Sequence, residues 1–310
     1  MSNDFFNTEG DDHHQGLART HKLSDGSIYF FLSHSELDEG DQGSVSQYRY
    51  SGPSDHDHIL ETAPLTVAPL EQLLEIDEQH PSDIAFLPDV NDLDAGYLLV
   101  AEEFDNRRVT IYRWEPFHDL AVQGHVFQGF PSTLPGDPGR GGPNFLFIDR
   151  VGDCYHLGIA SDHWGWGELL RAKEAALFPK CEQGSMNVSA FKPEGMFPFP
   201  VTGRPSQTKL IRDGEGNWYL LAFRSDPWHD PRGTDYVDVY GVEFSPFAIS
   251  YLLLSVHVFF KPGKTGFAST GTHHVEDSGR LLLSSSYRWS EDEGPGASSF
   301  VSRVDECPSS

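Results

Sequence analysis

The stretch Ala85-Phe86-Leu87-Pro88-Asp89, which leads through Gly96 into Tyr97-Leu98-Leu99-Val100, decides the fold. An apolar strand, a turn that contains Asp and Gly, and a second apolar strand are the signature of a β-hairpin. The same pattern recurs four more times at intervals of about sixty residues, a period that points to a repeat architecture. The second strands of these other copies open near Tyr29, Tyr155, Tyr219 and Leu282.

Further strand-like segments follow most copies of the hairpin. Third strands are expected at 45–50, 109–114, 236–242 and 300–304, and fourth strands at 58–67, 125–130, 187–191 and 251–260. Four antiparallel strands in each of five units resemble the five-bladed β-propeller architecture across nearly the whole chain. The resemblance is to the architecture and to no specific enzyme family. It implies an all-β fold, a five-bladed β-propeller of four-stranded antiparallel blades.

The repeat also sets the expected boundaries. A single propeller domain at 19–310 would contain blades at about 19–75, 83–132, 143–192, 206–262 and 271–305, after an N-terminal segment at 1–18. The fifth copy shows no fourth strand after Val304. The N-terminal segment around Phe5-Phe6 is therefore a candidate to close the ring, and the alternative is a frayed tail.

The composition excludes several classes of partner. The formal net charge of −25 disfavours nucleic acid, whose sequence-independent binding rests on Lys and Arg, and it disfavours anionic membranes. The acidic excess serves solubility or attracts cationic partners. Cys154, Cys181 and Cys307 form no CxxC pair, which argues against a disulfide framework and a thiolate zinc site.

The start of the chain shows no signal-peptide pattern, so a cytoplasmic location is the default expectation. A secreted mature form would look the same. The Asn187-Val188-Ser189 sequon matters only in that second case.

In a propeller, the connections that follow the second strands meet on one face with those that precede the first strands. Here these connections are rich in Trp, His and carboxylates, and loops on a rigid scaffold often carry function. We expect a surface there that binds a glycan or another small polar molecule. Its candidate residues are His34, Glu36, Glu102, Asp105, Asp162, His163, Trp164, Trp166, Gln207, Lys209, Trp228, His229, Arg288 and Trp289. The alternative is that each Trp caps its own blade and the acids are solvated.

Two other function classes remain open. The first is an enzyme (a hydrolase, lyase or isomerase) that uses His and carboxylates around the channel, with His21, His273, Asp83 and Glu194 as catalytic candidates. The second is a scaffold that grips a protein partner with the Trp-rich face. The sequence contains no dense catalytic motif that would decide between them.

A divalent metal is the cofactor considered, with His21, His273 and His274 as candidate ligands. Some five-bladed propellers are glycoside hydrolases, which need two carboxylates across the scissile bond. Asp83 and Glu194 precede the second and fourth innermost strands and suit that chemistry. However, Arg19-Thr20-His21 stands where the first blade would need an Asp, which argues against hydrolysis.

Overall fold

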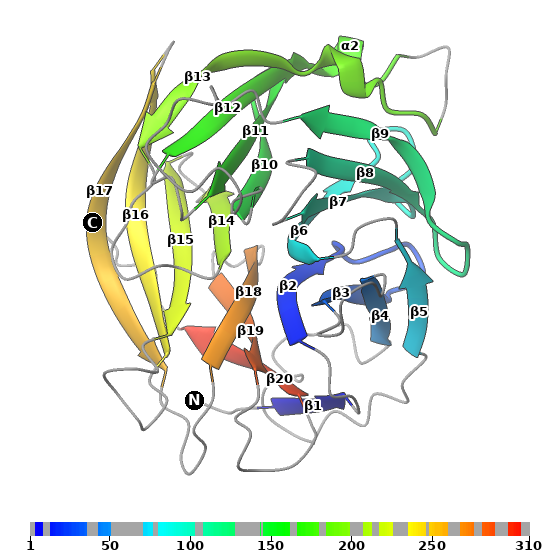
Figure 1. The fold of residues 1–310 in the computed structure, drawn as a ribbon, viewed down its shortest axis with the longest axis vertical. Helices are drawn as coiled ribbons and strands as arrows, with labels where there is room; N and C mark the ends of the chain where they lie inside the picture. The colour runs from blue at the N-terminus through cyan, green and yellow to red at the C-terminus, as the bar shows by residue number, and fades with distance from the viewer. Residues whose placement is uncertain are drawn as a thin grey trace.

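The computed structural model describes residues 4–8, 13–35, 43–50, 71–76, 80–102, 108–127, 143, 145–161, 166–179, 184–198, 207–212, 217–225, 235–245, 248–259, 267–275, 281–288 and 297–304. Within these ranges the strands form five four-stranded antiparallel sheets arranged around a centre (Figure 1). The all-β class and the propeller arrangement of four-stranded antiparallel blades are confirmed.

Each sheet is built mostly from consecutive strands. The first holds β2 (His13–Arg19), β3 (Ile28–Ser35), β4 (Ser44–Tyr50) and β5 (Glu71–Glu75). The second holds β6 (Pro81–Pro88), β7 (Gly96–Glu102), β8 (Arg108–Trp114) and β9 (Ala121–Phe127). The third holds β10 (Phe145–Val151), β11 (Cys154–Ser161), β12 (Trp166–Lys173) and β13 (Lys192–Pro198).

The fourth sheet holds β14 (Gln207–Arg212), β15 (Trp218–Ser225), β16 (Asp235–Ser245) and β17 (Ala248–Phe259). The fifth joins β18 (Phe267–Val275), β19 (Leu281–Arg288) and β20 (Ala297–Val304) to β1 (Asp4–Thr8) from the other end of the sequence. In this sheet Phe5 lies opposite Phe300. The short helices α2 (Glu174–Leu177) and η1 (Val188–Ala190) stand between β12 and β13.

The strands β2, β6, β10, β14 and β18 lie innermost, and they contact one another in turn. β2 contacts β6 and β18, β10 contacts β6 and β14, and β14 contacts β18. They therefore form a ring around a central axis, which is called the channel below (Figure 1). The end of this channel where the innermost strands begin is called the loop face below. The end where they turn into the second strands is called the turn face.

The first innermost strand begins earlier than expected, at His13 rather than near residue 19. The reason is the hairpin turn, which takes up the residues after Arg19. The Leu23 amide donates to the Ser27 carbonyl, and the Asp25 carboxylate accepts from the Ser27 amide at 2.8 Å. These local hydrogen bonds favour a turn over a strand. His21 therefore lies in the connection and not in the innermost strand.

Two of the expected fourth strands are displaced. Residues 187–191 contain the helix η1, and the strand follows at β13. The Asn187 side chain bonds the Ser189 hydroxyl at 2.7 Å and the Ala176 carbonyl at 3.2 Å, contacts that compete with a sheet ladder. The expected strand at 58–67 lies outside the described residues, and β5 is the fourth strand of that sheet.

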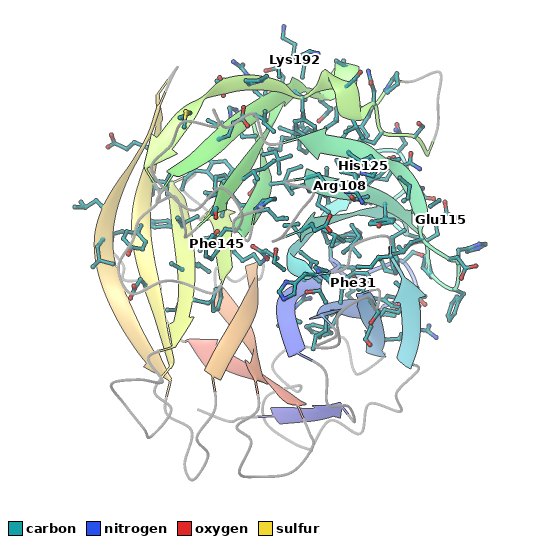
Figure 2. The ribbon with its side chains drawn as sticks, viewed as in Figure 1. Phe31, Arg108, Glu115, His125, Phe145 and Lys192 are labelled. Atoms are coloured by element: carbon teal, nitrogen blue, oxygen red, sulfur yellow. The ribbon has the colours of Figure 1, made fainter. Side chains whose placement is uncertain are left out.

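The core lies between neighbouring sheets. Trp114 is fully buried between the first two sheets, where its ring contacts Tyr29, Phe31 and Phe86 edge-on. Phe31 and Phe145 lie inside the molecule, whereas Glu115 and Lys192 lie at its edge (Figure 2). No helix in the described ranges has the length and apolar character needed to cross a membrane.

Candidate functional site

A buried ion pair between Asp83 and Lys209 lies at the loop face of the channel. The Lys209 ammonium of β14 lies 2.9 Å from Asp83 Oδ1 of β6, and the second oxygen, Oδ2, accepts from the Leu146 amide of β10 at 2.9 Å. Asp83 is 0% exposed and Lys209 is 5% exposed. Because all three residues lie near the starts of their strands, the pair spans three sheets at one level of the channel.

Burial governs the protonation of this pair. Desolvation lowers the pKa of Lys209 from its usual value, and the negative charge of Asp83 acts in the opposite direction. The ammonium also donates to the Ile84 carbonyl at 2.6 Å. Both oxygens of Asp83 thus have partners within the protein, and the carboxylate has no access to solvent.

The first sheet places Gly16, and no acid, beside Asp83. A Cβ added to Gly16 would lie 2.5 Å from the Ser82 carbonyl oxygen and 2.8 Å from the Ile84 amide nitrogen. A side chain at this point would therefore collide with the backbone on both sides of Asp83. The Gly16 amide donates to Ser33 Oγ at 2.7 Å, and that hydroxyl donates to the Ser82 carbonyl at 2.9 Å. Residues Arg19-Thr20-His21, considered for this place in the sequence, lie at the opposite end of β2.

Glu102 is the second buried carboxylate at the loop face. It ends β7, opposite Pro81 of β6, and is 2% exposed. Arg108 Nε lies 3.5 Å from Glu102 Oε2, across the connection between β7 and β8. Each of the two acids therefore faces a cation of the protein itself.

Glu194 does not lie near Asp83 in the fold. It belongs to β13, the strand of the third sheet farthest from the channel. There Glu194 Oε2 lies 3.2 Å from His156 Nδ1, and Oε1 accepts from Arg171 at 3.2 Å. Burial lowers the pKa of His156, and Glu194 opposes that shift. The sequence analysis predicts Glu194 near the channel, because it predicts that the fourth strand ends at residue 191 and that Glu194 follows it in a connection.

The remaining predicted residues divide into two groups. His21 lies beside the Phe86 ring at the turn face, and neither of its ring nitrogens has a hydrogen-bond partner among the described residues. For six of the others the structure describes the strand backbone but not the side chain. The remaining eight lie outside the described residues. The strand residues are His34, Trp166, Gln207, His273, His274 and Arg288, and the rest are Glu36, Asp105, Asp162, His163, Trp164, Trp228, His229 and Trp289.

A divalent metal finds no site in the part of the chain that the structure describes. No group of three or more His, Cys, Asp or Glu side chains lies together there. The candidates His273 and His274 have side chains outside that part, so their role as ligands stays a prediction.

Sequence reasoning selected both Asp83 and Lys209 but assigned them to separate roles, one catalytic and one ligand-binding. Their pairing could have been suspected from the strands, because each is a charged residue near the start of an innermost strand and is followed directly by two apolar residues. A buried charge usually needs a partner of opposite sign.

No protein-family model and no curated protein matches the sequence. Solved structures do resemble the fold. An exo-β-1,3-galactanase from Clostridium thermocellum has a TM-score of 0.53 at 11% identity, over 96% of this chain and 59% of the galactanase chain. A levansucrase mutant from B. megaterium has a TM-score of 0.55 at 9% identity, over 96% of this chain and 84% of the other.

A third similar structure is an α-L-arabinofuranosidase mutant from Fusarium graminearum in complex with an iminosugar inhibitor. Its TM-score is 0.52 at 8% identity, and the match covers 98% of both chains. The chain spans less than two thirds of the length of the galactanase. At these identities the likeness supports the β-propeller architecture and nothing finer.

Proposed function

We propose that this protein binds a glycan or another small polar molecule at its loop face and does not hydrolyse it. The observation that carries the proposal is the state of Asp83, whose two oxygens are occupied by Lys209 and the Leu146 amide. A carboxylate that is fully buried and ion-paired holds the scaffold together and is not free to act as a nucleophile or base.

Glycoside hydrolysis needs two carboxylates that face the same bond. At the loop face, Asp83 and Glu102 each lie beside a basic side chain. Position 16 of the neighbouring sheet leaves no room for an acidic side chain beside Asp83. Among the described residues, Asp83 and Glu102 are therefore not available as the pair that this reaction requires.

The similar structures support a carbohydrate ligand. They include a galactanase, a levansucrase and an arabinofuranosidase, whose names describe action on sugar polymers or glycosides. We also propose that the five sheets act as the five blades of one ring. Its loop connections would then bring Trp164, Trp228 and Trp289 to the same face as the Asp83–Lys209 pair.

Titration of the purified chain with oligosaccharides tests the proposal. The panel includes β-1,3-galactan, levan and arabinan fragments, followed by calorimetry and by product analysis. We expect at least one to bind, with affinity at least tenfold lower in Trp164→Ala, and with no product released. The matched control is Phe117→Ala, because Phe117 is an exposed aromatic side chain in the connection between β8 and β9, at the turn face.

Hydrolysis that disappears in Asp83→Asn would overturn the non-catalytic part of the proposal. Failure of every glycan to bind, together with retention of a protein from solution through the Trp residues, would favour the scaffold function instead. Stoichiometric metal removed by His273→Ala would support the metal-dependent enzyme.

A further inference from the structure

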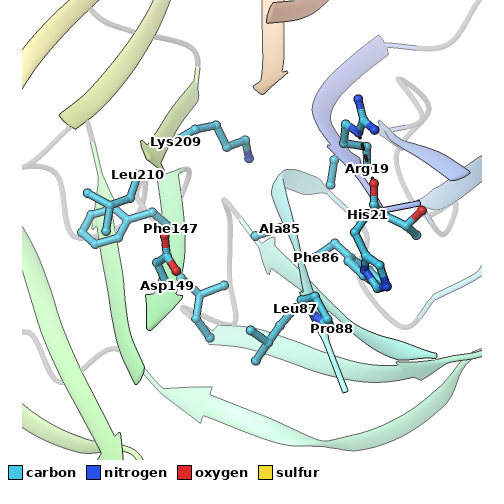
Figure 3. Close-up of a pocket in the computed structure, with 13 residues that line it drawn as sticks. Arg19, His21, Ala85, Phe86, Leu87, Pro88, Phe147, Asp149, Lys209 and Leu210 are labelled. Carbon is cyan, nitrogen blue, oxygen red and sulfur yellow. Dashed lines mark hydrogen bonds between the residues drawn. The ribbon is translucent and has the colours of Figure 1, made fainter. Parts of the chain in front are cut away.

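The turn side of the channel contains a cavity that the loop-face proposal does not use. Its volume is about 240 Å³, and it is partly open (Figure 3). The walls come from the end of β2 and the two residues after it, from the later residues of β6, and from the middle of β10 and β14. The cavity thus lies on the turn side of the Asp83–Lys209 pair and extends toward the tight turns.

Lys209 supplies a polar group to this cavity. An ammonium carries three N–H donors, and two of them are used by Asp83 and the Ile84 carbonyl. The third has no acceptor among the described residues, and the side chain reaches across the upper part of the cavity in Figure 3. A buried donor without an acceptor costs about 1–3 kcal/mol, so an acceptor from a ligand or from water is favoured there.

The rest of the lining combines polar and apolar groups. Arg19, Thr20, His21 and Asp149 contribute polar atoms, while Ala85 and Leu210 belong to the apolar walls. Small-molecule sites typically show this combination of apolar walls and a few convergent polar groups. The orientation of a bound molecule would be fixed chiefly by the Lys209 ammonium.

The charges of the site select a neutral ligand. Asp83 already neutralises Lys209, and the lining adds one further positive side chain, Arg19, and one further negative one, Asp149, so a charged ligand of either sign meets no net opposite charge. A cation would face the Lys209 ammonium directly. A hydroxyl accepts from the ammonium without either cost, and the C–H faces of a polyol suit the apolar walls.

The size of the cavity limits the ligand further. A volume of about 240 Å³ corresponds to roughly eight water molecules at about 30 Å³ each. It is smaller than the pockets that hold drug-sized ligands. A small polyol or one monosaccharide fits this volume, whereas an oligosaccharide does not.

We propose that this cavity is a second binding site, distinct from the loop face, which takes a small neutral polyol or a single monosaccharide. It is formed at the turn side of the channel by Lys209 and the walls around Ala85. The loop-face proposal and this one share the Asp83–Lys209 pair but not the ligand site, so either can fail alone.

Calorimetric titration of the full chain with glycerol, erythritol, xylose and glucose tests the inference, with gluconate and glucosamine as charged analogues of glucose. We expect a neutral member to bind, and both charged analogues to bind at least tenfold more weakly. Ala85→Leu adds volume to the cavity wall and leaves the ion pair intact. It should weaken binding of the neutral ligand at least tenfold while oligosaccharide binding at the loop face is unchanged.

The matched control is Ala121→Leu, the same change at an exposed position of β9. If Ala85→Leu fails to fold by circular dichroism, Ala18→Val fills the neighbouring wall, formed by β2, and serves in its place. Tighter binding of a charged analogue, equal affinity in the filled variant, or no neutral ligand bound at millimolar concentration would each overturn the inference. In the last case the cavity holds water only.

Discussion

Lys209 Nζ lies 2.9 Å from Asp83 Oδ1 although the two residues are 126 positions apart in the sequence. The contact joins the second sheet to the fourth across the channel, and the Leu146 amide adds the third sheet through the same carboxylate. Three innermost strands are thereby held at one level. The pair is both the floor of the proposed loop-face site and the upper boundary of the turn-side cavity.

The ion pair predicts an asymmetric response to mutation. Lys209→Met leaves Asp83 buried without its cation, which should lower the free energy of unfolding by about 3–5 kcal/mol. The double variant Lys209→Met/Asp83→Leu removes both charges and should regain most of that loss. Urea unfolding followed by circular dichroism measures both, and a double variant no more stable than the single one would contradict the prediction.

Close packing of Phe147 against Gly158 predicts a steric defect. A Cβ at Gly158 would approach Phe147 Cζ to 2.1 Å, so Gly158→Ala should destabilise the fold by about 1–3 kcal/mol. Phe147→Leu on the same background removes the ring and should restore part of the loss. The midpoints of thermal unfolding of the two variants measure this loss and its recovery. An unchanged midpoint in Gly158→Ala would show that the ring can move aside.

A hydrogen bond between the first two sheets predicts coupling between Trp114 and Gln47. Trp114 Nε1 donates to Gln47 Oε1 at 2.8 Å, and both side chains are buried. Trp114→Phe removes this donor and should cost about 1–3 kcal/mol, in addition to the loss of packing. In a double-mutant cycle with Gln47→Leu, we expect a coupling energy of at least about 0.5 kcal/mol. Purely additive effects would mean that the bond contributes nothing.

Two buried tyrosines predict a loss of stability in alkali. Burial raises the pKa of Tyr97 to about 12, and that of Tyr155 to about 12, from 10.0. Between these values the unfolded chain loses protons that the native state keeps. Stability should therefore be intact below pH 10 and fall as the pH rises toward 12.

The alkaline effect is measured by unfolding at a series of pH values. Tyr97→Phe/Tyr155→Phe should show a weaker fall between pH 10 and 12 than the parent chain, because two of the titrating groups are gone. Phe at these positions keeps the buried rings in place. An identical pH profile in the double variant would assign the effect to other groups.

Much of the fold is predictable because its signals are local. The Asp-Gly turn after Leu23 and the apolar segments around it contain their own hairpin chemistry, and the structure shows the Asp25 carboxylate bonded to the Ser27 amide as such turns require. The residues at which strands begin and end are less predictable. The helix η1 replaced an expected strand because Asn187 bonds its neighbours, a competition that depends on contacts with Ala176.

The candidate site was harder to predict because its contacts are long-range. Asp83 and Glu194 look alike in sequence, yet one lies in the channel and the other at the outer strand with His156 and Arg171. The difference arises from a shift of one strand by a few residues. Periodicity does not fix such shifts, because the side chains of a strand repeat every two residues.

The sequence by itself determined the repeat, the all-β class and the antiparallel four-stranded unit, since turn chemistry and apolar alternation act over a few neighbouring residues. The tertiary structure decided which charged groups meet. Whether Asp83 is a free acid or a paired one depends on Lys209, which only the closing of the sheets around the channel brings within 2.9 Å. Electrostatic pairing acts through space, and its partners are set by the arrangement of the sheets.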